Sequence, residues 1–127
     1  MDTQRTIMVV DDNPDIITIV KTILEGKGYQ VLSASSGQEL LNLLPDRKPD
    51  LIILDIMMPE MDGLEVLGRL KAVTETASIP VILLTAKVQY EDVLGGYKLG
   101  ADYYITKPFT STQLVNGINL LLGESKN

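Results

Sequence analysis

The sequence has 127 residues, 45% of them hydrophobic and 22% charged, which is the composition of one folded domain that needs no disulfide or structural metal. Its 17 Asp and Glu against 11 Lys and Arg give a net charge of −6, which argues against a nucleic-acid-binding face. The chain has no Cys and no His, so disulfides, thiolate chemistry, the serine triad and a histidine base are excluded.

Signals for membranes or export are missing from the sequence. The longest apolar runs are far shorter than the roughly 18 residues that cross a bilayer, and residues 1–5 lack the apolar core of a signal peptide. We therefore expect a cytoplasmic protein without membrane contact. One domain is expected over residues 1–127, with its core at about 5–123 and a short polar tail at 124–127.

Two hydrophobic periodicities alternate along the chain. Short apolar runs predict five strands, at 7–10, 29–34, 51–54, 81–84 and 103–105. Apolar residues at spacings of three and four predict five helices, whose apolar positions lie at 16–24, 40–44, 64–70, 90–99 and 114–122. This alternation predicts a doubly wound α/β fold, with a parallel sheet covered by helices on both faces.

Local signals set the ends of these helices. Asn13 is a good N-cap and precedes Pro14, which suits the first helical position. Ser36 with Glu39 predicts a capping box, and Asp62 can cap the third helix. Pro45 is expected to stop the second helix.

Polar side chains follow four of the five predicted strands. They are Asp11 with Asp12, then Asp55, Thr85 and Lys107. The carboxyl ends of parallel strands share one edge of a sheet, where ligands of such folds bind, so these side chains should meet there. Three carboxylates and one ammonium leave a charge of −2, which one divalent cation would balance. All-oxygen ligands suit Mg²⁺ or Mn²⁺, and a cation, a lysine and a hydroxyl beside a carboxylate also suit phosphoryl transfer.

Each of these residues alone is more simply a helix cap, a turn former, a strand end or a loop lysine. Their joint placement at strand ends is what favours a site. Competing motifs fail. The acidic start at 11–15 mimics a calcium loop, but Ile16 stands at the glycine position, and neither a P-loop nor a dinucleotide-binding glycine pattern is present. Met57 also breaks the paired aspartates of the aspartate-nucleophile phosphatases.

Five motifs stand in order along the chain: Val9-Val10-Asp11-Asp12-Asn13, Asp55-Ile56-Met57-Met58-Pro59-Glu60-Met61-Asp62-Gly63, Leu84-Thr85-Ala86, Gly100-Ala101-Asp102-Tyr103-Tyr104 and Lys107-Pro108-Phe109. Together they resemble the receiver domain of two-component response regulators, from about residue 5 to residue 123. The resemblance implies a five-stranded, flavodoxin-like sheet with strand order 2-1-3-4-5.

The resemblance implies a role for each residue of the site. Asp55 matches the phosphoacceptor, which takes a phosphoryl group from a phosphohistidine on a partner histidine kinase or phosphotransfer protein. Asp12 and Asp55 match direct ligands of Mg²⁺, for which Mn²⁺ can substitute, together with the backbone carbonyl of Met57. Asp11 matches an acid that acts on the metal through water. Lys107 matches the residue that contacts the phosphoryl oxygens.

The same resemblance implies a switch. Thr85 matches a hydroxyl that moves towards the phosphoryl group, and Tyr104 matches an aromatic residue that swings inward behind it. Pro108 matches a proline whose preceding peptide bond is often cis in the family. The chain would thus catalyse its own phosphorylation and dephosphorylation on Asp55 without being an enzyme in the ordinary sense.

The helix at 90–99 is expected to be the mobile element, because Gly95 and Gly96 each cost about 1 kcal/mol against Ala in a helix interior. With the fifth strand and the last helix it would form the output surface. This surface would serve a homodimer after phosphorylation, as in many relatives.

A long-lived phosphoryl state is expected from two positions that line the path of the hydrolytic water in the family. Met57, two residues past Asp55, has no group that orients water and is bulky. Lys87, two residues past Thr85, can only donate hydrogen bonds. The alternative is that Lys87 simply points into solvent.

Three alternatives to a phosphorylated receiver stay open at this point. A receiver-like adaptor without phosphorylation is one, although all five key residues are present. A flavodoxin-like electron carrier is another, without the expected Ser- and Thr-rich phosphate loop and without Trp. The third is a stand-alone metal-dependent phosphatase. The initial Met suggests that the receiver comes first in its gene.

Overall fold

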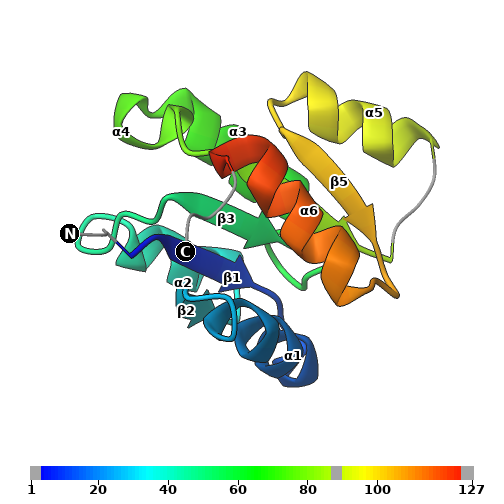
Figure 1. Cartoon of the computed structure of the whole chain (residues 1–127). Helices are drawn as coiled ribbons and strands as arrows, with labels where there is room; N and C mark the ends of the chain where they lie inside the picture. The colour runs from blue at the N-terminus through cyan, green and yellow to red at the C-terminus, as the bar shows by residue number, and fades with distance from the viewer. Residues whose placement is uncertain (1–3, 87–89, 124–127) are drawn as a thin grey trace.

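The computed structural model describes residues 4–86 and 90–123 (Figure 1). Five strands alternate with helices, as predicted. The strands are β1 (Thr6–Val10), β2 (Gln30–Ala34), β3 (Leu51–Leu54), β4 (Val81–Thr85) and β5 (Tyr103–Thr106). The helices are α1 (Pro14–Glu25), α2 (Gly37–Leu43), α3 (Gly63–Ala72), α4 (Thr74–Ala77), α5 (Tyr90–Lys98) and α6 (Ser111–Leu122). The single turn α4 has no predicted counterpart, so the predicted fourth and fifth helices are α5 and α6.

The strands form one parallel sheet in the order β2-β1-β3-β4-β5, which confirms the predicted fold class and strand order. At the carboxyl edge, Val10 pairs with Leu54 and Thr85 pairs with Thr106. Thr85 is therefore the last residue of β4 rather than the first residue after it. The carboxyl ends of β1, β3, β4 and β5 consequently lie along one edge.

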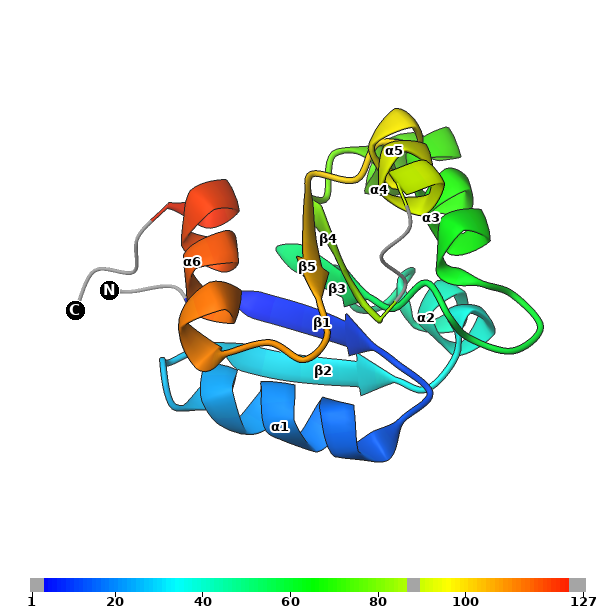
Figure 2. The ribbon, with the colours of Figure 1, turned by 90° about the vertical axis from the view of Figure 1, so that its right-hand side faces the viewer.

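Helices cover both faces of the sheet (Figure 2). Each face has its own apolar cluster. One cluster packs residues of α2 and α3 against the sheet, including Leu40 and Leu67. The other packs residues of α1 and α6, including Leu24 and Leu114. All four residues of β3 are buried, because this central strand has neighbours on both sides and helices on both faces.

The predicted caps hold three of the helices at their first turns. The Asn13 side chain accepts a hydrogen bond from the Asp15 N–H at 2.9 Å, directly before Pro14 opens α1. Asp62 likewise accepts a hydrogen bond from the Glu65 N–H at 2.9 Å. The caps at Asn13 and Asp62 help to order the loops that follow β1 and β3, at the carboxyl edge of the sheet.

The capping box predicted at α2 is only half correct. The Ser36 hydroxyl accepts from the Glu39 N–H at 3.1 Å, as expected. The Glu39 carboxylate, however, accepts from the N–H and hydroxyl of Ser35 instead of returning to the Ser36 N–H. A complete capping box does form at α6, between Thr110 and Gln113, and the sequence interpretation missed it.

The two glycines of α5 have different surroundings. Gly95 faces open space, whereas a Cβ on the buried Gly96 would meet the Cδ1 atom of Leu83 in β4. The interpretation that both merely weaken the helix is therefore wrong for Gly96, which lets α5 approach the sheet closely. No helix within residues 4–86 and 90–123 has the length and apolar character to cross a membrane.

Candidate functional site

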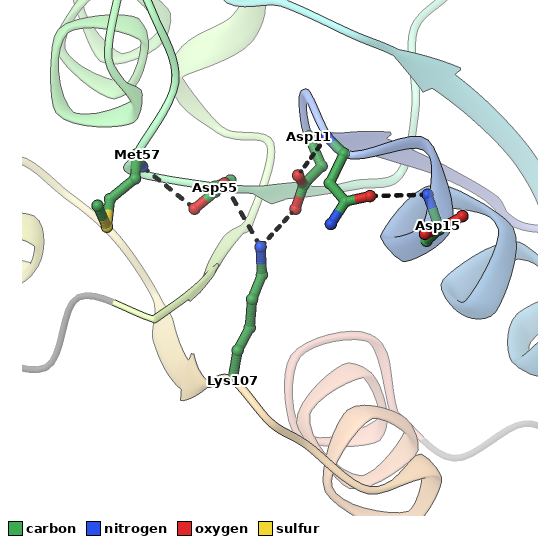
Figure 3. A network of polar contacts seen from close by, with 6 residues as sticks. Asp11, Asp15, Asp55, Met57 and Lys107 are labelled. Atoms are coloured by element: carbon green, nitrogen blue, oxygen red, sulfur yellow. Dashed lines mark hydrogen bonds and ion pairs between the residues drawn. The ribbon is translucent and has the colours of Figure 1, made fainter.

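Three predicted site residues meet at the carboxyl edge of the sheet (Figure 3). Asp11 follows β1, Asp55 follows β3 and Lys107 follows β5. The Lys107 Nζ atom lies 2.8 Å from the Asp11 Oδ2 atom and 3.4 Å from the Asp55 Oδ2 atom, so one ammonium bridges two carboxylates.

Backbone hydrogen bonds of the sheet continue one residue beyond the strands and fix these three positions. The Asp11 N–H donates to the Ala34 carbonyl at 3.2 Å, and the Asp55 N–H donates to the Val10 carbonyl at 3.0 Å. The Lys107 N–H donates to the Thr85 carbonyl at 3.0 Å. The sheet itself therefore sets the spacing of the site.

The second oxygen of each buried carboxylate is held by a local backbone donor. The Asp11 Oδ1 atom accepts from the Asn13 N–H at 2.9 Å, and the Asp55 Oδ1 atom accepts from the Met57 N–H at 3.1 Å. Each carboxylate thus has one oxygen on the backbone and one turned towards Lys107. This arrangement leaves the orientation of both side chains well defined.

Burial and charge oppose each other at Asp11. Asp11 and Asp55 are only 2% and 4% exposed, whereas Asp12 is exposed. Burial raises the pKa of Asp11 above its ordinary value of 3.8, the charge of Asp55 adds to the increase, and hydrogen bonds from Lys107 and the Asn13 N–H oppose it. One ammonium does not compensate for the three carboxylates.

This cluster fits a divalent cation with hard oxygen ligands. One carboxylate oxygen from each of Asp11, Asp12 and Asp55 lies within 4.8 Å of the others. The charge of −2 predicted for this edge is thus concentrated in a space that one ion can occupy. Carboxylates and carbonyls without His or Cys are the ligand set of Mg²⁺.

The structure places Thr85 and Tyr104 on the same face of the sheet. Thr85 is fully buried at the end of β4. Its partner on β5 is Thr106, two residues beyond Tyr104, and alternate residues of a strand share a face. Tyr104 packs half-buried against the cluster formed with α2 and α3.

The remaining predicted residues lie at the margin of the site. The Met57 side chain is 56% exposed and points away from the Asp55 carboxylate (Figure 3). The Lys107–Pro108 peptide bond is cis. Lys87 lies outside the described residues.

Gly63 supports the site in a way that the sequence interpretation did not recognise. A Cβ at Gly63 would collide with the Asp55 carbonyl and the Ile56 Cα, and the Gly63 N–H donates to the Ile56 carbonyl at 2.9 Å. The loop from Asp55 therefore closes back on its own start. The Asp62-Gly63 dipeptide was the available signal for such a close turn.

Comparisons with known proteins agree with this geometry. Residues 7–119 match the family described as the response regulator receiver domain. The chain is 40% identical over 122 residues to the alkaline phosphatase synthesis transcriptional regulatory protein PhoP of Bacillus subtilis, covering 96% of this chain and 50% of that protein. It is 42% identical to the phosphate regulon transcriptional regulatory protein PhoB of Pseudomonas aeruginosa, covering 93% of this chain and 52% of PhoB.

A solved structure shares the fold as a whole. The chemotaxis protein CheY4 of Vibrio cholerae superposes with a TM-score of 0.90 at 28% identity, covering 94% of this chain and 100% of CheY4. The chain spans about half the length of the curated relatives PhoP and PhoB.

The chain belongs to the response regulator receiver domain family of two-component signalling. This membership confirms the resemblance and favours the receiver interpretation over the flavodoxin-like carrier and the unphosphorylated adaptor. Members of the family are signalling domains, and phosphorylation and Mg²⁺ binding are general features of them.

Proposed function

We propose that this receiver accepts a phosphoryl group on Asp55 from a phosphohistidine of a partner histidine kinase or phosphotransfer protein. The observation that carries the proposal is the buried Asp55 carboxylate, which faces Lys107 at 3.4 Å within a three-carboxylate cluster. We assign residues 1–127 to this one domain, with its core at about 5–123.

The step exchanges one bond to phosphorus for another. An Asp55 carboxylate oxygen bonds to phosphorus while the bond from phosphorus to the imidazole nitrogen of the donor breaks, and the electron pair stays on that nitrogen. The products are an aspartyl phosphate and the partner's histidine. A carboxylate is a weak nucleophile, so the rate must come from placement and charge compensation.

The residues around Asp55 supply both. Lys107 already lies between the two buried carboxylates and can contact a phosphoryl oxygen without a change of backbone position. Asp12, Asp55 and the Met57 carbonyl would hold Mg²⁺, or Mn²⁺ in its place, with Asp11 acting through water; the bound ion would offset charge on the phosphoryl oxygens. The Met57 N–H keeps the Asp55 carboxylate oriented.

Intact mass after incubation with acetyl phosphate and Mg²⁺ tests the proposal. We expect one addition of about 80 Da. It should disappear in Asp55→Asn and persist in Asp46→Asn, which removes an exposed carboxylate elsewhere. Modification that survives Asp55→Asn, or steady turnover of acetyl phosphate without a stable adduct, would support a different phosphoacceptor or a phosphatase.

We further propose that Thr85 and Tyr104 report phosphorylation to a surface formed by α5, β5 and α6. The two side chains share the face of the sheet that α5 approaches through Gly96. This surface exposes large apolar side chains, of which Tyr97 and Leu120 are 44% and 67% exposed. Apolar exposure of this kind suits a homodimer formed after phosphorylation. Sedimentation with and without beryllofluoride, a phosphoryl mimic, should show association that Leu120→Glu abolishes.

The phosphorylated state is proposed to persist for minutes or longer. Met57 offers only its backbone to the site, and its thioether cannot accept a proton from an attacking water. Decay of the aspartyl phosphate should accelerate in Met57→Asn and in Lys87→Glu. Decay rates that neither substitution raises would show that these side chains do not control the lifetime.

A further inference from the structure

Lys71, at the end of α3, contacts two other parts of the chain, both far from Asp55. Its Nζ atom donates to the carbonyls of Ala77 and Ile79, each at 3.0 Å, and lies 3.9 Å from the Asp102 Oδ2 atom. Its stem packs over Gly100, where a Cβ would lie about 3.1 Å from the Lys71 Cγ. One half-buried side chain thus connects α3, the α4–β4 turn and the α5–β5 turn.

The C-terminal end of α5 is anchored again by Asp102. The Asp102 N–H donates to the Val81 carbonyl at 2.9 Å, and its carboxylate accepts from the Val81 N–H at 2.8 Å. This reciprocal pair attaches the α5–β5 turn to the first residue of β4.

The helix end itself has a regular stop. The Gly100 N–H donates to the Tyr97 carbonyl at 3.1 Å and the Ala101 N–H donates to the Gly96 carbonyl at 2.9 Å, with Gly100 at a φ of 108°. These two bonds and the left-handed glycine form a Schellman motif. Residues 96–102 therefore form a closed, hydrogen-bonded unit around the point where Gly96 meets Leu83.

We propose that Lys71 is a positioning residue that clamps residues 96–102, so that activation displaces α5 only at its N-terminal half and the helix pivots about this clamp. The proposal rests on the proposed function, since phosphorylation supplies the displacement. Because β4 begins at the clamp and ends at Thr85, a change at Thr85 acts at the other end of the strand. The clamp turns a small change at the site into a tilt of the output helix rather than its release.

Hydrogen exchange of the whole chain tests the clamp first without activation. In Lys71→Met, which keeps an apolar stem and removes the ammonium, amides of residues 96–102 should exchange severalfold faster than the global loss of stability explains, while those of residues 90–95 change by less than twofold beyond it. The control is Val20→Ala, which opens the fully buried core on the opposite face. After correction for the global stability of each variant, equal patterns in Lys71→Met and Val20→Ala would overturn the proposal.

The second arm adds beryllofluoride with Mg²⁺. In the wild type, exchange should change severalfold in residues 90–95 and less than twofold in residues 96–102; in Lys71→Met the change should spread through residue 102. Equal changes in both halves of wild-type α5 would overturn the pivot. If beryllofluoride changes exchange nowhere in the chain, the proposed function fails, and the first arm still decides whether Lys71 clamps residues 96–102.

Discussion

The two ends of the sheet each hold one half-buried lysine, and the two lysines have opposite surroundings. Lys107 and Lys71 have similar exposure, 18% and 21% of the side chain. Lys107 faces two buried carboxylates, with Asp12 beside them, so negative charge exceeds positive charge around it. Lys71 donates to two neutral carbonyls and only approaches the half-exposed Asp102.

This contrast distinguishes a functional site at the carboxyl edge from a structural contact, the Lys71 cluster with Ala77, Ile79 and Asp102, at the opposite end of the sheet. At the carboxyl edge, excess charge in a buried place leaves a need that a cation and a phosphoryl group can meet. At the opposite end, the polar groups already satisfy one another, so nothing remains for a ligand to supply. We therefore propose that a half-buried lysine serves a phosphoryl-transfer site where negative charge exceeds positive charge, as at Lys107, and holds structure where its partners are neutral carbonyls, as at Lys71.

The largest change in stability should follow from removing the contacts of the Lys71 ammonium. Lys71→Met removes two charge-assisted hydrogen bonds and should lower the free energy of unfolding by about 2–3 kcal/mol. Urea unfolding measures it. Asp102→Asn is the matched comparison: it removes the 3.9 Å ion pair yet keeps an oxygen for the Val81 N–H, so less than about 0.5 kcal/mol should be lost. A loss as large in Asp102→Asn would make the ion pair, not the carbonyl bonds, the source of stability.

The sequence could predict the residues of the functional site far better than the contacts of Lys71. An all-apolar β3 fixes a buried strand, and parallel topology then brings Asp11, Asp55 and Lys107 to one edge by geometry alone. Lys71, by contrast, stands in an amphipathic helix as any surface lysine would. Its partners are backbone carbonyls of a turn, which carry no sequence signal.

Close contacts were hidden for a related reason. Whether a side chain fits at Gly96 depends on how closely α5 packs against β4. Whether one fits at Gly63 depends on how its loop closes on Asp55. In the sequence, a glycine indicates only backbone flexibility. The packed structure is needed to show which atoms a Cβ at that position would contact. The capping box at α2 is incomplete for a similar reason, because the backbone places the Ser35 N–H, rather than that of Ser36, within reach of the Glu39 carboxylate.

The next largest effect should appear in metal affinity. Asp12→Asn should weaken Mg²⁺ binding about tenfold, or about 1.4 kcal/mol, because it removes one of the clustered carboxylates. Titration calorimetry measures it. The carboxylate at the opposite end supplies the control, since Asp102→Asn should leave the affinity unchanged. Unchanged affinity in Asp12→Asn would place the ion elsewhere.

A smaller effect of opposite sign is expected for Asp11 in the absence of metal. Because burial raises its pKa, the stability that Asp11 contributes is fully present below its ordinary pKa of 3.8 and is lost as pH rises through the higher folded value. Asp11→Asn should therefore stabilise the metal-free protein at pH 7 by about 1 kcal/mol, a rise of a few degrees in Tm.

Two conditions should remove this gain. It should shrink as pH falls towards 3.8, where the wild-type carboxyl is itself protonated. Saturating Mg²⁺ should reverse it, because the wild type binds the ion more tightly and is stabilised by mass action. An Asn variant that is less stable at every pH would show that the Lys107–Asp11 contact outweighs the burial of charge.

The smallest expected changes in stability come from alanine substitutions at two adjacent glycines of α5, and they should differ in sign. Gly95→Ala should stabilise the protein by about 0.5–1 kcal/mol, since its Cβ meets open space and Ala favours the helix. Gly96→Ala should instead cost about 1 kcal/mol, because its Cβ must displace the Leu83 Cδ1 atom, although that atom ends a flexible side chain. Gly68→Ala, equally unobstructed in α3, is the control and should gain as Gly95→Ala does. Thermal unfolding of the three variants measures the signs, and a gain at Gly96 would show that Leu83 yields without cost and that α5 does not depend on this close approach.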